Sequence, residues 1–142
     1  MPQRSVVAVG ASLLVASLAL AGCGSRSDDT EGTDTGSAEN KVAKIGVIAP
    51  LSGDLAALGK GIQNSVDLAI RQANEAKTIP GWTLELAAED DQATPDVGKN
   101  AATKLAADKD VVGVVGTLNS SVAQSVQPVL AAANIVQVSP AN

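Results

Sequence analysis

The 142-residue sequence contains no histidine, tyrosine or phenylalanine, and it has a single cysteine and a single tryptophan. The absence of histidine removes the commonest general base and metal ligand. With one aromatic side chain, the core is expected to be aliphatic, and stacking on aromatic rings is nearly excluded as a way to bind a ligand. One cysteine cannot form an intramolecular disulfide. The net charge of −5 argues against a nucleic-acid-binding surface.

The first 22 residues have the features of an export signal. Arg4 and the amino terminus give a positive start, and residues 5–20 form an uncharged apolar run. That run is too short for a comfortable membrane span, which takes roughly 20 apolar residues. The tetrapeptide Leu-Ala-Gly-Cys that ends at Cys23 resembles the bacterial lipobox. We therefore expect residues 1–22 to be a lipoprotein signal peptide and Cys23 to be an acylated membrane anchor. The alternatives are a plain signal peptide with an incidental cysteine and a single anchor helix.

Residues 24–40 are rich in Gly, Ser, Thr, Asp and Glu, and Ala38 is their only aliphatic residue. Such a segment buries too little apolar surface to offset the entropy lost on ordering. We expect residues 23–40 to form the lipidated cysteine and a flexible tether that separates a folded domain from the membrane.

From residue 41 onward, strand and helix patterns alternate. The apolar runs and their periodicity predict strands over 44–49, 82–89, 111–115 and 135–139, and helices over 59–76, 95–107 and 122–133. Thr94 and Pro95 suit the cap and the first position of the second helix. Pro128 is expected to kink the third helix or delay its regular part. Helical spacing predicts these inward residues: Leu58, Ile62, Val66, Ala69 and Ala73 in the first helix, and Val97, Ala101 and Leu105 in the second.

This β-α-β-α-β-α-β order predicts an α/β fold: a doubly wound parallel sheet with helices on both faces. Ligands of such sheets bind at the carboxyl ends of the strands, near the switch in strand order. Segments 50–58, 116–121 and 139–142 are expected to meet at that edge. Because the pattern stops directly after a strand, we expect the sequence to be a fragment of a longer protein.

The segment Gly116–Ser121 turns from a predicted buried strand into a predicted helix. The free N–H groups at a helix start and the positive end of its dipole attract an anion such as a carboxylate. The hydroxyls of Ser120 and Ser121 can add hydrogen bonds there. The sequence therefore predicts a carboxylate-binding corner. The alternative is that both serines are simple helix caps that need no ligand.

The acidic run Glu89-Asp90-Asp91 could suggest a metal or acid–base site, but a solvated strand end and turn is the preferred interpretation. No Ser-His-Asp set can exist without histidine, and no Gly-x-Ser-x-Gly elbow occurs. Neither a dinucleotide fingerprint nor a P-loop motif follows the first strand. We therefore expect no catalytic residue, no metal and no cofactor.

Four segments, taken in order, resemble the substrate-binding lipoproteins of ABC importers for branched-chain amino acids, which have the type I periplasmic-binding fold. They are Lys44–Gly53, Glu89–Gln92, Gly116–Ser121 and Val138–Ala141. The resemblance extends over residues 41–142. It implies the N-terminal part of the first lobe of a clamp that closes on a free amino acid and delivers it to a membrane permease. The second lobe, with its ammonium-binding acid, is absent.

The resemblance also implies roles for single residues. Ser120 would hydrogen-bond the α-carboxylate of the ligand, with Ser121 as a second candidate, and the main chain of Ala141 would contact the polar head. Leu118 and Leu58 would line the side-chain pocket, although position 58 is often aromatic in relatives and both leucines are also ordinary core candidates.

The leading functional hypothesis is therefore extracytoplasmic capture of leucine, isoleucine or valine by a lipid-anchored protein that is not an enzyme. One alternative keeps the fold and binds short amides, urea or another small polar solute. A second is a flavodoxin-like or hydrolytic enzyme. A third is that this fragment binds nothing by itself, because half a clamp lacks the closing lobe.

Overall fold

The computed structural model describes residues 40–142. The predicted signal peptide, the lipidation at Cys23 and all but the last residue of the tether lie outside the described residues. Within residues 40–142, none of the helices combines the length and apolar character that a membrane span needs.

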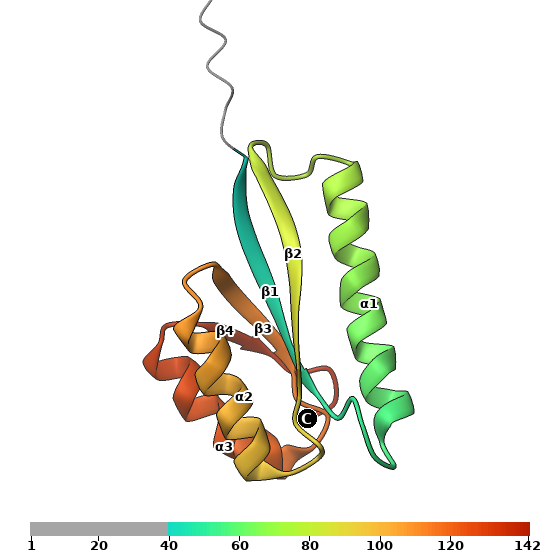
Figure 1. The fold of residues 1–142 in the computed structure, drawn as a ribbon, viewed down its shortest axis with the longest axis vertical. Helices are drawn as coiled ribbons and strands as arrows, with labels where there is room; N and C mark the ends of the chain where they lie inside the picture. The colour runs from blue at the N-terminus through green and yellow to red at the C-terminus, as the bar shows by residue number, and fades with distance from the viewer. Residues whose placement is uncertain (1–39) are drawn as a thin grey trace, which may run out of the picture. The chain divides into compact units, whose positions relative to one another are not determined.

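The described chain alternates strands and helices in the predicted order. The elements are β1 (Lys41–Ala49), α1 (Ala56–Glu75), β2 (Trp82–Asp90), α2 (Pro95–Ala107), β3 (Val111–Gly116), α3 (Ser120–Ala132) and β4 (Val136–Val138). The four strands form one sheet in the order β2-β1-β3-β4, and every neighbouring pair is parallel. Helix α1 lies on one face of the sheet, and α2 and α3 lie on the other (Figure 1). The predicted α/β class with a doubly wound parallel sheet is confirmed.

Strand β1 lies inside the sheet and pairs with both β2 and β3. Near its carboxyl end, Ile48 is opposite Glu89 of β2 and opposite Gly116 of β3. The crossover through α1 leads from β1 to one side, whereas the crossover through α3 leads from β3 to the other. The switch in strand order therefore falls between β1 and β3, and their carboxyl ends adjoin at the edge where ligands of such sheets bind.

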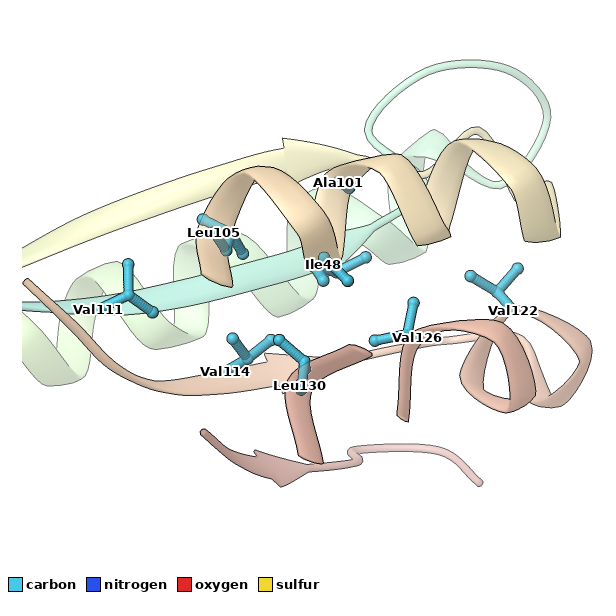
Figure 2. Close-up of a cluster of buried hydrophobic side chains, with 9 residues drawn as sticks. Ile48, Ala101, Leu105, Val111, Val114, Val122, Val126 and Leu130 are labelled. Carbon is cyan, nitrogen blue, oxygen red and sulfur yellow. The ribbon is translucent and has the colours of Figure 1, made fainter. Parts of the chain in front are cut away.

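The apolar core lies between the sheet and the pair α2 and α3 (Figure 2). Its buried members come from two strands and two helices: Ile48, Ala101, Ala102, Leu105, Val111, Val114, Val122, Val126 and Leu130. Small residues let the two helices approach closely. A Cβ placed on Gly98 of α2 would lie 2.3 Å from Cγ1 of Val122 in α3. The inward positions Ala101 and Leu105 are confirmed as buried.

The opposite face is covered less completely. Helix α1 packs on β1 and β2, and its only buried residues are Gly59 and Ile70. The predicted inward position of Leu58 is wrong, because this side chain is 58% exposed, and Ala69 is also exposed. The helical periodicity identified an apolar stripe, but it could not show that an open groove lies between Leu58 and Val115 of β3.

Three local expectations are corrected at element ends. Helix α3 is regular from Ser120, two residues earlier than predicted, and it continues through Pro128, so the expected delay is wrong. Thr94 occupies the cap position of α2 as predicted, but its hydroxyl donates to the Gln92 carbonyl at 3.1 Å and makes no capping bond. Strand β4 has three residues and is shorter than expected.

Candidate functional site

The bend between β3 and α3 begins at Gly116, where any larger residue would force the backbone to move. Gly116 has a φ of 153°, and a Cβ placed on it would lie 2.2 Å from the carbonyl oxygen of Ile48. Any side chain at this position would collide with the main chain of β1. The glycine therefore allows the end of β3 to lie directly beside the end of β1, where the two loops can share one site.

Hydrogen bonds from two other segments hold this bend. Thr117 is fully buried, and its hydroxyl donates to the carbonyl of Asn119 at 2.9 Å. The side-chain amide of Gln137 in β4 donates to the Gly116 carbonyl at 2.8 Å. Beyond β4, the amide of Asn142 donates to the Thr117 carbonyl at 3.3 Å. Because the carbonyls of Gly116, Thr117 and Asn119 have fixed partners, the start of α3 is held in a defined orientation.

Helix α3 starts at this bend with its first turn exposed. Its cap residue is Asn119, so Ser120 and Ser121 are not the capping residues; both are exposed in the first turn. The N–H groups of Val122 and Ala123 donate to the Asn119 carbonyl at 3.1 and 3.0 Å. The N–H groups before them have no acceptor within a helix, and the dipole adds positive potential. This corner can therefore hold a carboxylate with two hydroxyls and main-chain donors.

The loop between β1 and α1 is tied to the end of β2 by one carboxylate. Asp90 accepts hydrogen bonds from the Leu51 N–H at 2.8 Å, the Ser52 hydroxyl at 2.5 Å and the Gln92 N–H at 2.9 Å. Partial burial raises the pKa of Asp90, but the hydrogen bonds from Ser52, Gln92 and Leu51 outweigh it, so its pKa lies below the usual value. Asp90 is therefore an ionised acceptor that joins two loops of the site.

Its neighbour Asp91 has the opposite environment. Asp91 is fully buried, and one carboxylate oxygen accepts the Ala93 N–H at 2.8 Å. Burial raises the pKa of Asp91, and the nearby charge of Asp90 adds to this shift. The interpretation of this acidic run as a solvated strand end is therefore wrong for Asp91. The described residues contain no group of three side chains that could hold a metal ion.

An apolar groove lies near the same edge of the sheet, beside the first half of α1. Its volume is about 390 Å³, and its lining includes Leu58 from α1, Val115 from β3 and Pro140 from the segment after β4. The groove thus brings together α1, β3 and the segment after β4. Leu118 is half-buried within the bend, and Ala141 is exposed next to Pro140.

Sequence reasoning did not find the residues that fix the loops. Asp90, Thr117 and Asn142 each join segments that are far apart in the chain, as the separation of 39 residues between Leu51 and Asp90 illustrates. A polar residue after a buried strand was the one available signal, and it does not identify the bonding partner.

Comparison with known proteins agrees with this architecture. A family model described as periplasmic binding protein matches residues 42–142. The Leu/Ile/Val-binding protein BraC3 of Rhizobium johnstonii is 38% identical over 96 residues, which cover 68% of this chain and 26% of the relative. The chain therefore spans about a quarter of the length of the curated relatives it matches.

Two solved structures with a similar fold were determined in complex with a ligand. The branched-chain amino acid transporter substrate binding protein LivJ from Streptococcus pneumoniae, in complex with isoleucine, has a TM-score of 0.67 and 29% identity, over 71% of this chain and 29% of that one. A solute binding protein of an ABC transporter from Rhodopseudomonas palustris, in complex with 3,4-dihydroxy benzoic acid, has a TM-score of 0.62 and 29% identity, over 70% of this chain and 27% of that one. With a family match over most of its length and a parallel α/β sheet whose loops meet at the switch point, the chain belongs to the periplasmic binding protein family.

Proposed function

We propose that this chain is the N-terminal part of the extracytoplasmic substrate-binding component of an ABC importer. It captures a branched-chain aliphatic amino acid and delivers it to the membrane permease. The observation that carries the proposal is the corner at the start of α3. There, a glycine-dependent bend presents an exposed helical turn with two serines at the switch point of the sheet. The Leu/Ile/Val-binding relatives support the ligand class.

In the proposed complex, the two ends of the ligand meet different chemistry. Ser120, with Ser121 beside it, donates to the α-carboxylate, and the main chain of Ala141 contacts the polar head. Leu118 and Leu58 form the aliphatic wall, with the groove next to Leu58 continuing the apolar surface. Polar donors would fix the zwitterion, while the wall would discriminate side chains by size at ~1–3 kcal/mol per methylene.

We also propose that the protein is anchored outside the cytoplasm. Residues 1–22 would be removed as a lipoprotein signal peptide, and acylated Cys23 would hold the mature protein at the membrane, next to its permease. The support is the lipobox-like sequence that ends at Cys23. Labelling with radioactive palmitate in the native host tests this, and Cys23→Ser should abolish the label.

A second candidate ligand is an aromatic acid. The neighbour that binds 3,4-dihydroxy benzoic acid has the same identity to this chain as the neighbour that binds isoleucine, namely 29%. Both ligands have a carboxylate, so both suit the corner at α3. The aliphatic side chains of Leu58, Val115 and Pro140 along the groove favour the aliphatic ligand.

Thermal-shift measurements on the full-length protein separate these possibilities. The panel contains leucine, isoleucine, valine, 3,4-dihydroxybenzoate, urea and a short amide. We expect the three branched-chain amino acids to raise the melting temperature, because a ligand that binds only the folded state stabilises it. Stabilisation by the aromatic acid alone, or by urea or amides alone, would reject the proposed ligand.

A further inference from the structure

We propose that Asp90 is a positioning residue for the ligand site. Its hydrogen bonds hold the segment between β1 and α1 and thereby determine the position of the Leu58 side chain. Asp90 itself is not expected to contact the ligand. The inference rests on the proposed function, because Leu58 matters only if it forms part of the wall around a ligand side chain.

Both oxygens of the Asp90 carboxylate accept hydrogen bonds from the segment between β1 and α1. Oδ1 accepts the N–H of Leu51 at 2.8 Å and the N–H of Gln92 at 2.9 Å. Oδ2 accepts the hydroxyl of Ser52 at 2.5 Å. Hydrogen bonds to an ionised acceptor are about twice as strong as neutral ones. Two successive residues of the loop are therefore fixed to the end of β2 by one side chain.

The first turn of α1 follows directly from this loop. The carbonyl of Pro50 packs against Gly59 so closely that a Cβ on the glycine would lie 1.9 Å from the oxygen. The N–H of Ala56 donates to the Gly53 carbonyl at 3.1 Å. The cap residue Leu55 makes no side-chain capping bond. A displacement of the loop would therefore move the start of the helix, where Leu58 is located.

The polar anchor of α1 on the sheet lies at the other end of the helix, where Asn74 exchanges hydrogen bonds of 2.8 and 2.9 Å with the main chain of Leu84. Ile70 is the only large buried side chain of α1, and Leu58 is 58% exposed. The position of the first turn thus depends on the loop more than on packing beneath the helix. Loss of the Asp90 hydrogen bonds should therefore change the position of Leu58.

The consequence is specific to the size of the ligand side chain. A displaced Leu58 leaves the carboxylate corner at Ser120 intact but removes wall contacts that a large aliphatic group needs. Loss of Asp90 should therefore weaken leucine binding more than alanine binding. A purely structural role would instead lower stability and leave the ratio of the two affinities unchanged.

The test is isothermal titration calorimetry of the full-length protein with leucine and with alanine. Asp90→Ala should weaken leucine binding roughly tenfold and alanine binding less than about threefold, in keeping with the cost of lost contacts to a few methylenes. Asp90→Asn should restore the wild-type ratio, since its oxygen can accept both N–H groups and its amide can donate to the Ser52 hydroxyl. Ser52→Ala, which removes one bond from an exposed residue, should shift the ratio partway and covers the case in which Asp90→Ala does not fold.

Asp96→Ala, at an exposed acid in the first turn of α2, is the matched control and should leave both affinities unchanged. If the wild type binds leucine but the ratio of leucine affinity to alanine affinity is unchanged in both Asp90→Ala and Ser52→Ala, the inference is overturned. If Asp90→Asn is as weak as Asp90→Ala, positioning by hydrogen bonds is also refuted. Absence of leucine binding in the wild type would instead refute the proposed function.

Discussion

The two faces of the sheet differ in how completely their helices cover them. On one face, α2 and α3 pack against each other and against the sheet, and Val122 and Val126 are completely buried. On the other face, α1 covers β1 and β2, while Val136 and Val138 of β4 remain 67% and 59% exposed. The difference teaches that the contiguous buried cluster belongs to the α2–α3 layer, whereas the first turn of α1, near the site, has few buried side chains to fix its position.

The largest expected difference between the two faces is the loss of stability when a large side chain is truncated. Leu130→Ala, in the α2–α3 layer, should lower the free energy of unfolding by about 2–5 kcal/mol, because it leaves a cavity in a closely packed core. Leu68→Ala is the matched control on α1, where the side chain is 47% exposed, and should cost less than about 1 kcal/mol. Urea denaturation of the two variants measures the difference. Equal losses would show that the two layers do not differ as described.

Two glycine-to-alanine substitutions, one on each face of the sheet, should change the stability of the protein in opposite directions. Gly98→Ala places a Cβ 2.3 Å from Val122 and should destabilise the protein by about 1–3 kcal/mol through overpacking. Gly61→Ala on α1 meets no heavy atom within 4 Å, so it should stabilise the helix by roughly 0.5–1 kcal/mol. Thermal melts followed by circular dichroism record both shifts. A stabilising Gly98→Ala would contradict the close approach of α2 and α3.

The smallest effect concerns acid titration at Asp91. Because burial raises its pKa in the folded state, its stability contribution is complete below the unfolded pKa and is lost as the pH rises through the folded pKa. Asp91→Asn cannot ionise and should therefore gain stability relative to the wild type as the pH increases. The difference between the two unfolding free energies, measured from roughly pH 3 to pH 7, should grow with pH. A constant difference across that range would show that Asp91 ionises normally in the fold.

The sequence was sufficient for the order of elements because each has a strong local signal. Helix α2 illustrates this: Pro95 suits its first position, and Ala101 and Leu105 recur at helical spacing and are buried. The same reasoning was wrong for Leu58, since periodicity identifies an apolar stripe but cannot show how much of it a neighbouring element covers.

The candidate site was predicted in part for the same reason. A strand that leads through Gly116 into a helix is a local pattern, and the bend lies where it was expected. The bonds that hold it were not predictable, because Asp90 and Asn142 find their partners only after segments 25 or more residues apart come together. The roles of Ser120, Ser121, Leu118, Leu58 and Ala141 toward a ligand stay predictions.

The most direct test of the account is whether Ser120 contacts the carboxylate of the ligand. Calorimetry on the full-length protein should compare leucine with leucinol, which lacks the carboxylate, in the wild type, in Ser120→Ala and in the control Ser125→Ala. We predict that Ser120→Ala weakens leucine binding about ten- to hundredfold, the value of a hydrogen bond to a charged group, and leucinol binding less than about threefold. Equal losses for both ligands, or an unchanged affinity for leucine, would contradict the account.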